Sequence, residues 1–91
     1  MEGCGRAVVR IVNKKGLHAR ASAKIVEAAA RFQSHITVSK DGQAVDARSI
    51  MGLMMLAASE GCEIAIEAKG PDADAALDAM VALVEAKFGE D

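Results

Sequence analysis

The sequence predicts an α+β fold, an open-faced sandwich in which a four-stranded antiparallel sheet carries three helices on one face. Four short segments alternate apolar and polar residues, as strands with one buried face do. Three other segments repeat apolar residues at the period of a helix that is buried on one side. The segments follow one another in the order β-α-β-β-α-β-α. Amphipathic strands and helices in this order can bury their apolar faces against one another in two layers.

The first strand is expected over residues 6–12, which are rich in valine and isoleucine. A basic loop, residues 13–16, separates it from a run of good helix formers, residues 21–31. The helix should therefore begin close to position 18. The residues expected to face the core are Ala7, Val9 and Ile11 of the strand and Ile25, Val26, Ala29 and Phe32 of the helix.

A hairpin is expected in the middle of the chain, because Asp41-Gly42 is a strong two-residue turn signal. The turn joins a strand over residues 36–40 to another over residues 43–46. It sets Val38 opposite Val45, so that both valines lie on the same face and the register agrees with burial.

A short helix is expected over residues 50–57, directly after Ser49, which is a favoured residue for capping a helix start. Leu53 and Leu56 are expected to face the core. The helix is then either wholly buried or exposes an apolar patch that meets partner proteins. The residues of that patch are Ile50, Met51 and Met54.

The last strand is expected over residues 63–68, with isoleucines on one face and glutamates on the other. Gly70-Pro71-Asp72 should open the last helix, with the proline at its first position. Gly89 is placed to end this helix. Its expected apolar stripe consists of Leu77, Met80, Val81, Val84 and Phe88.

Composition excludes several classes of protein. The chain has 91 residues, enough for a single domain over residues 1–91. Its formal net charge is −2 and it contains no Tyr or Trp, so platforms for stacking bases are missing and nucleic-acid binding is disfavoured. There is no apolar run as long as a membrane span and no signal-peptide pattern, so a cytoplasmic location is expected.

The two cysteines, Cys4 and Cys62, are far apart and fit no metal-ligand spacing. We expect neither a metal site nor a cofactor. Both cysteines are expected to be free thiols in a reducing compartment, and a disulfide between them is the alternative.

The stretch Gly16 to Ser22 carries the chemistry. A lysine pair leads into it, and His18 and Arg20 stand where the first helix should begin. Unpaired N–H groups and the positive end of the helix dipole make such a position a site for an anion, above all phosphate. A neutral imidazole is a nucleophile that could take a phosphoryl group, and a guanidinium would stabilise the added charge. The alternative is a surface histidine in a basic turn.

The segment Gly16-Leu17-His18-Ala19-Arg20 resembles the active-site signature of the HPr family, the phosphocarriers of the phosphoenolpyruvate-dependent phosphotransferase system. A second segment, residues 48–54, resembles the regulatory serine region of the same family. The resemblance covers residues 6–88 and implies the family's open-faced sandwich, with the helix after Ser49 lying beside the His18 loop. One position differs: the family usually has proline, which would preset the first helical turn, where this chain has Ala21.

The resemblance also implies roles. His18 would accept phosphoryl through Nδ1 from phospho-enzyme I and pass it to EIIA-type domains, with Arg20 stabilising the charge. Ser49 would be a regulatory phosphorylation site for HPr kinase/phosphorylase. The protein would be a monomeric carrier with transferase-type chemistry, in a sugar-uptake or a nitrogen-type regulatory branch, and not an enzyme with turnover of its own. The docking residues shared by its partners would be Ile50, Met51 and Met54.

Two other classes are weighed against the carrier. A regulatory interaction module would bind phosphotransferase-system or transcription-regulator partners without phosphoryl transfer, and the presence of His18 and Arg20 argues against it. A small metal carrier on a related sandwich is disfavoured because the chain has no CxxC motif.

Overall fold

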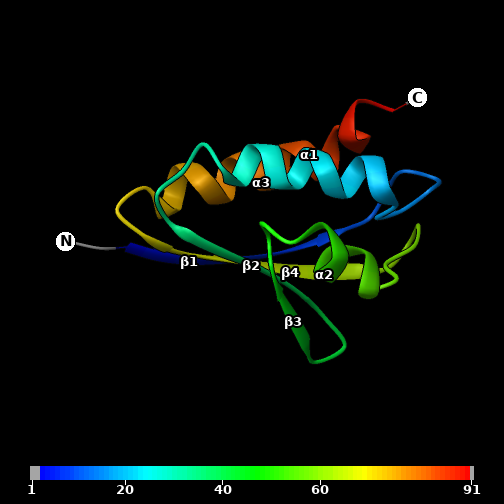
Figure 1. The fold of residues 1–91 in the computed structure, drawn as a ribbon, viewed down its shortest axis with the longest axis horizontal. Coiled ribbons are helices and arrows are strands. Elements are labelled where there is room, and N and C mark those ends of the chain that lie inside the picture. Colours follow the sequence, from blue (N-terminus) through cyan, green and yellow to red (C-terminus); the bar gives the residue numbers. More distant parts are fainter. Residues whose placement is uncertain (1–2, 91) are drawn as a thin grey trace.

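The structure, a computed structural model, describes residues 3–90 and has the predicted order of strands and helices. The four strands form one antiparallel sheet in the order β1-β4-β2-β3. Helices α1 and α3 lie side by side over one face of the sheet, and α2 packs against α1 and β3 (Figure 1). The predicted open-faced sandwich is therefore confirmed. The elements are β1 (Gly3–Arg10), α1 (Ala19–Ala29), β2 (His35–Lys40), β3 (Gln43–Asp46), α2 (Ile50–Met55), β4 (Glu63–Gly70), α3 (Ala73–Glu85) and a 3₁₀ turn, η1 (Lys87–Gly89).

The predicted hairpin is confirmed in its register, because Val38 pairs with Val45 on either side of the Asp41-Gly42 turn. The face of the sheet away from the helices is mostly polar, although Val8 of β1 is exposed there. There Arg6 and Glu67 are opposite each other and form an ion pair at 3.7 Å. Exposed ion pairs of this kind contribute little to stability. This face of the sheet is therefore in contact with solvent and does not form a second core.

The core lies between the sheet and the helices. Ile11 and Leu17 are buried at the two ends of the loop that follows β1, so this loop is fixed to the core on both sides. Phe88 of η1 is fully buried as well, which fixes the C-terminal segment. The largest fully buried apolar side chains are Phe88, Ile11, Leu53, Ile64, Ile66, Met80, Val38 and Val84.

Two predicted boundaries in the first half of the chain are corrected. The first strand runs over Gly3–Arg10 rather than residues 6–12, because its limits are set by its partner. Its last residue pairs with Glu63, the first residue of β4, so the ladder has no further partner beyond that point. The first helix begins at Ala19, close to position 18 as expected, but it ends at Ala29 rather than at Arg31.

The prediction that Pro71 is the first residue of the last helix is wrong. Asp72 is the N-cap and Ala73 the first helical residue, while Pro71 lies in the turn before them. This helix also ends before Gly89. Lys87 and Phe88 have left-handed backbones, with φ of 58° and 56°, which no α-helix accommodates.

The helix after Ser49 ends at Met55 rather than at Ala57, whose φ is 52°. Within residues 3–90, no helix is long and apolar enough to cross a membrane.

Candidate functional site

His18 is the N-cap of α1, as the sequence predicts. Its backbone is extended, with φ of −76° and ψ of 179°, and its ring Nδ1 accepts a hydrogen bond from the Arg20 backbone N–H at 3.2 Å. Its carbonyl oxygen accepts from the N–H of Ser22 at 2.9 Å. A histidine therefore caps this helix, a role that Ser, Thr, Asp and Asn usually have. Position 21, where the family that the sequence resembles usually has proline, is occupied in the first turn of α1 by Ala21, which is fully buried.

The loop before His18 requires the glycine at position 16. Gly16 has a φ of +63°, and a Cβ built on it would lie 2.3 Å from the carbonyl oxygen of Ala58. The next residue, Leu17, donates its N–H to that same oxygen at 2.9 Å. The loop is therefore tied to the segment that follows α2. Any side chain at position 16 would push the two segments apart.

A cavity of about 380 Å³ opens at the N-terminal end of α1. Four of its lining residues are cations and one is a carboxylate. The helix dipole adds positive potential at the same place, so the cavity is suited to an anion such as phosphate. Its lining residues are Lys14, Lys15, His18, Arg20, Lys24, Gly89 and Glu90.

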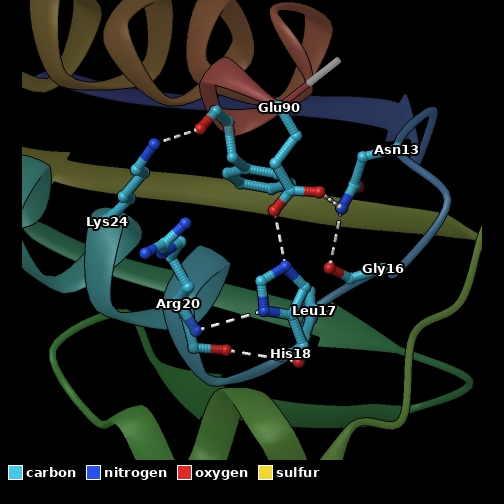
Figure 2. A network of polar contacts seen from close by, with 9 residues as sticks. Asn13, Gly16, Leu17, His18, Arg20, Lys24 and Glu90 are labelled. Atoms are coloured by element: carbon cyan, nitrogen blue, oxygen red, sulfur yellow. Dashed lines mark hydrogen bonds and ion pairs between the residues drawn. The ribbon is translucent and has the colours of Figure 1, made fainter.

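Glu90 holds the other nitrogen of the histidine ring. Its Oε2 lies 2.5 Å from Nε2 of His18, although the two residues are 72 positions apart (Figure 2). Its Oε1 accepts a hydrogen bond at 3.1 Å from Asn13, whose amide nitrogen also donates to the carbonyl oxygen of Gly16 at 2.9 Å. Donation from Asn13, and then from His18, holds the pKa of the Glu90 carboxyl below its usual value. The ring thus has a negative charge against it on the side away from the helix.

The C-terminal segment is held in place from α1. Lys24 donates a hydrogen bond from its ammonium group to the carbonyl oxygen of Phe88, whose ring is buried in the core (Figure 2). The sequence carried a usable signal for Lys24, because it follows Arg20 by one helical turn on the same face. Sequence reasoning missed Glu90, for which there is no local signal.

The predicted cap at Ser49 is confirmed. Its Oγ accepts a hydrogen bond at 3.0 Å from the N–H of Gly52, in the first turn of α2. Leu53 and Leu56 face the core as predicted, and four apolar side chains of α2 are exposed. Sequence reasoning missed one of them, Met55, although it follows Met51 by one helical turn. The exposed fractions are 41% for Ile50, 71% for Met51, 42% for Met54 and 67% for Met55.

The structure brings the two predicted segments together, because α2 packs against α1 and the chain just beyond α2 bonds to Leu17. The second histidine is elsewhere. His35 is exposed at the start of β2 and lines a small hollow with Thr37, Glu67 and Lys69. It has no share in the cavity that His18 lines.

Cys4 and Cys62 are both free thiols. Over residues 3–90, no group of three or more His, Cys, Asp or Glu side chains is placed to hold a metal ion.

The chain matches the family described as "PTS HPr component phosphorylation site" over residues 6–86. It is 52% identical over 80 residues to the phosphocarrier protein HPr of Cupriavidus necator, which covers 88% of this chain and 90% of the relative. It is 49% identical over 82 residues to the phosphocarrier protein NPr of Shewanella violacea, covering 90% of each.

Solved structures agree with these relatives. An HPr from Thermoanaerobacter tengcongensis superposes with a TM-score of 0.91 at 45% identity, covering 96% of this chain and 98% of the other. An HPr from Bacillus anthracis superposes with a TM-score of 0.86 at 43% identity, covering 90% of this chain and 98% of the other. The chain therefore belongs to the HPr family, and it is a phosphocarrier of the phosphotransferase system. Membership also implies that it works with the enzymes of that system.

Proposed function

We propose that the chain carries its phosphoryl group on His18, receives it from phospho-enzyme I and passes it to EIIA-type domains. One observation supports this assignment above the others. His18 lines the cavity together with four cationic side chains, and its Nδ1 atom accepts a hydrogen bond from the first turn of α1. In the transfer, the lone pair of Nδ1 forms the new bond to phosphorus. The bond between phosphorus and the donor breaks, and its electron pair returns to the donor.

Arg20 has two parts in the proposed reaction. Its backbone N–H bonds to Nδ1 in the unphosphorylated protein, and it becomes free for a phosphoryl oxygen once Nδ1 is bound to phosphorus. Its guanidinium supplies charge-assisted hydrogen bonds to the same group. The lysines that line the cavity add to the positive potential that attracts the phosphorylated donor.

The exposed face of α2 is the proposed docking surface for enzyme I and the EIIA domains. It is apolar, it is rich in methionine and it lies on the helix that packs beside the His18 loop. Such a surface can repack against several partners. Ser49, at the start of this helix, is the proposed target of HPr kinase/phosphorylase.

We further propose that residues 1–91 act as one HPr-like domain, as a monomer in the cytoplasm. The family match over residues 6–86 supports the single domain, since it takes in both the His18 loop and the Ser49 helix.

Labelling with enzyme I and radioactive phosphoenolpyruvate tests the assignment of His18. His18→Ala should take no acid-labile label, while His35→Ala, the matched histidine variant on the other face, should label like the wild-type protein. Label that survives in His18→Ala would place the phosphoryl group on another residue and overturn the proposal.

A further inference from the structure

We infer that Glu90 is a positioning residue for His18: its carboxylate keeps a proton on Nε2, both before and after Nδ1 takes the phosphoryl group. This inference rests on the proposed role of His18. It assigns to the C-terminal segment a part in the reaction that lies outside the sequence signature of the family.

The first argument is the tautomer of the ring. A neutral imidazole has one donor nitrogen and one acceptor nitrogen, and the contacts of each decide which is which. Nδ1 faces a backbone N–H, from Arg20, so it must be the acceptor. Nε2 faces a carboxylate, from Glu90, so it must be the donor (Figure 2). Both contacts select the tautomer that leaves the lone pair of Nδ1 available to phosphorus.

The second argument is the charge around the ring. The charged groups that line the cavity with His18 are Lys14 and Lys15 of the loop, Arg20 and Lys24 of α1, and Glu90. Four positive groups oppose any positive charge on the ring. Among the described residues that line this cavity, Glu90 alone is negative and can offset them.

The contact is also well held. The side chains of His18 and Glu90 are 26% and 19% exposed, so the solvent screens their attraction less than that of a surface pair. Asn13 holds the second carboxylate oxygen, and Lys24 holds the carbonyl oxygen of Phe88 two residues earlier. Glu90 is thereby fixed in front of Nε2 from two directions.

The proton on Nε2 matters when the phosphoryl group leaves. With Nδ1 bonded to phosphorus and Nε2 still protonated, the ring carries one positive charge. When the bond breaks, its electron pair returns to Nδ1 and the ring departs as neutral imidazole. Without the Nε2 proton the ring would have to depart as an anion, which is a far poorer leaving group at neutral pH. Glu90 therefore keeps the phosphorylated carrier in the form that can pass its group on.

Two variants of Glu90 separate its hydrogen bond from its charge. Glu90→Gln keeps an oxygen that can accept from Nε2–H but removes the negative charge, and Glu90→Ala removes both. Glu85→Gln is the matched control, since Glu85 is an exposed glutamate at the end of α3. Thermal unfolding of all three proteins checks that the fold is kept.

The first measurement is the pH profile of phosphoryl release from the isolated phosphoprotein. Release should slow as the ring loses its proton. In both Glu90 variants we expect release to slow at a lower pH than in the wild-type protein, because the carboxylate that faces Nε2–H is gone. Glu85→Gln should follow the wild-type profile.

The second measurement is the ¹⁵N chemical shifts of the His18 ring in the unphosphorylated protein at alkaline pH. The wild-type protein and Glu90→Gln should hold the proton on Nε2, while Glu90→Ala should show a smaller share of that tautomer. Wild-type pH profiles and wild-type tautomer populations in both folded variants would reduce Glu90 to a structural contact. A wild-type protein that takes no label on His18 would instead overturn the proposed function, and the tautomer measurement would stand apart from that result.

Discussion

The backbone N–H of Arg20 donates a hydrogen bond to Nδ1 of His18 at 3.2 Å. The side chain of Arg20 takes no part in this contact and is exposed. The two contributions of Arg20 to the site, a backbone donor and a guanidinium, can therefore be separated by mutation. Removing the side chain leaves the N-terminal cap of α1 intact.

Arg20→Ala should slow phosphoryl transfer without unfolding the protein. The variant loses charge-assisted hydrogen bonds to the phosphoryl group, which contribute roughly 1.5–3 kcal/mol. If the transition state feels this loss in full, the rate falls by about one to two decades. Stopped-flow or quench measurements of transfer to and from His18 give the rates.

Arg31→Ala is the control for this experiment, because Arg31 is an exposed arginine just beyond the other end of α1. It should transfer at the wild-type rate. Equal rates in Arg20→Ala and the wild-type protein, in both directions, would make Arg20 a solvated charge with no part in transfer.

The strands, helices and hairpin could be predicted because their signals are local. Alternation, helical spacing and the Asp41-Gly42 turn each act within a few residues of the chain. The limits of β1 could not be predicted, since they depend on where β4 begins, more than fifty residues later. The start of α3 was missed for a similar reason. The carboxylate of Asp72 is engaged with Ser34 of a different segment, which fixes Asp72 outside the helix.

The residues of the site likewise fall into those with a local sequence signal and those without one. His18 and Arg20 were found because a helix start is visible in the sequence and a histidine there breaks the usual capping preference. Glu90 was not found, because its position depends on the left-handed backbones of Lys87 and Phe88. Such a backbone costs a residue other than glycine about 1–2 kcal/mol. The left-handed backbone occurs together with burial of the Phe88 ring in the core. No local sequence pattern predicts a left-handed backbone at a buried phenylalanine.

Gly16→Ala should destabilise the protein and slow transfer, because the new Cβ meets the carbonyl oxygen of Ala58 at 2.3 Å. The loop that carries His18 would have to move. Gly42→Ala is the matched control: its φ is also positive, at +82°, but a Cβ there meets nothing within 4 Å. Gly42→Ala should therefore lose only the free energy that a left-handed backbone costs alanine, about 1–2 kcal/mol.

Chemical denaturation of the two glycine variants gives the comparison. Gly16→Ala should lose more unfolding free energy than Gly42→Ala, and it alone should transfer slowly. Equal losses with normal transfer in both would mean that the loop accommodates a side chain at position 16.

Asp72→Asn should lower stability in a pH-dependent manner. The Asp72 carboxylate accepts hydrogen bonds from the Ser34 hydroxyl at 2.5 Å and from the backbone N–H groups of Gln33 and Ser34 at 2.9 Å each. Donation from the Ser34 hydroxyl, and then from the Gln33 N–H, holds the pKa of Asp72 below its usual 3.8. The stabilisation is therefore complete above that pH and is lost as the pH falls towards the lower folded value.

Urea denaturation at pH 7 and pH 3 measures this effect. The difference in unfolding free energy between the wild-type protein and Asp72→Asn should be larger at pH 7 than at pH 3. Asp78→Asn, an exposed aspartate in the middle of α3, should show no such dependence. A constant difference at both pH values for Asp72→Asn would assign its effect to packing rather than to the carboxylate.

Phosphorylation of Ser49 should switch off docking rather than unfold α2. Its Oγ already accepts from the first turn of the helix, and a phosphate there would gain N–H donors and the positive end of the dipole. What changes is the surface. A charge of about −1.5 to −2 appears beside the exposed side chains of Ile50 and Met51. A partner that buries this patch must desolvate the charge or meet it with its own acidic groups, and both are unfavourable.

Two variants at position 49 test the switch. Ser49→Asp, a partial mimic of phosphoserine, should weaken binding of enzyme I and slow phosphorylation of His18. Ser49→Ala should transfer close to the wild-type rate and lose only the cap, about 1 kcal/mol of stability. The rate of His18 phosphorylation and the thermal midpoint are measured for both. Wild-type transfer by Ser49→Asp would place the docking surface away from Ser49. Slow transfer with a collapsed thermal midpoint would assign the effect to unfolding, because the mechanism requires a folded protein that docks poorly.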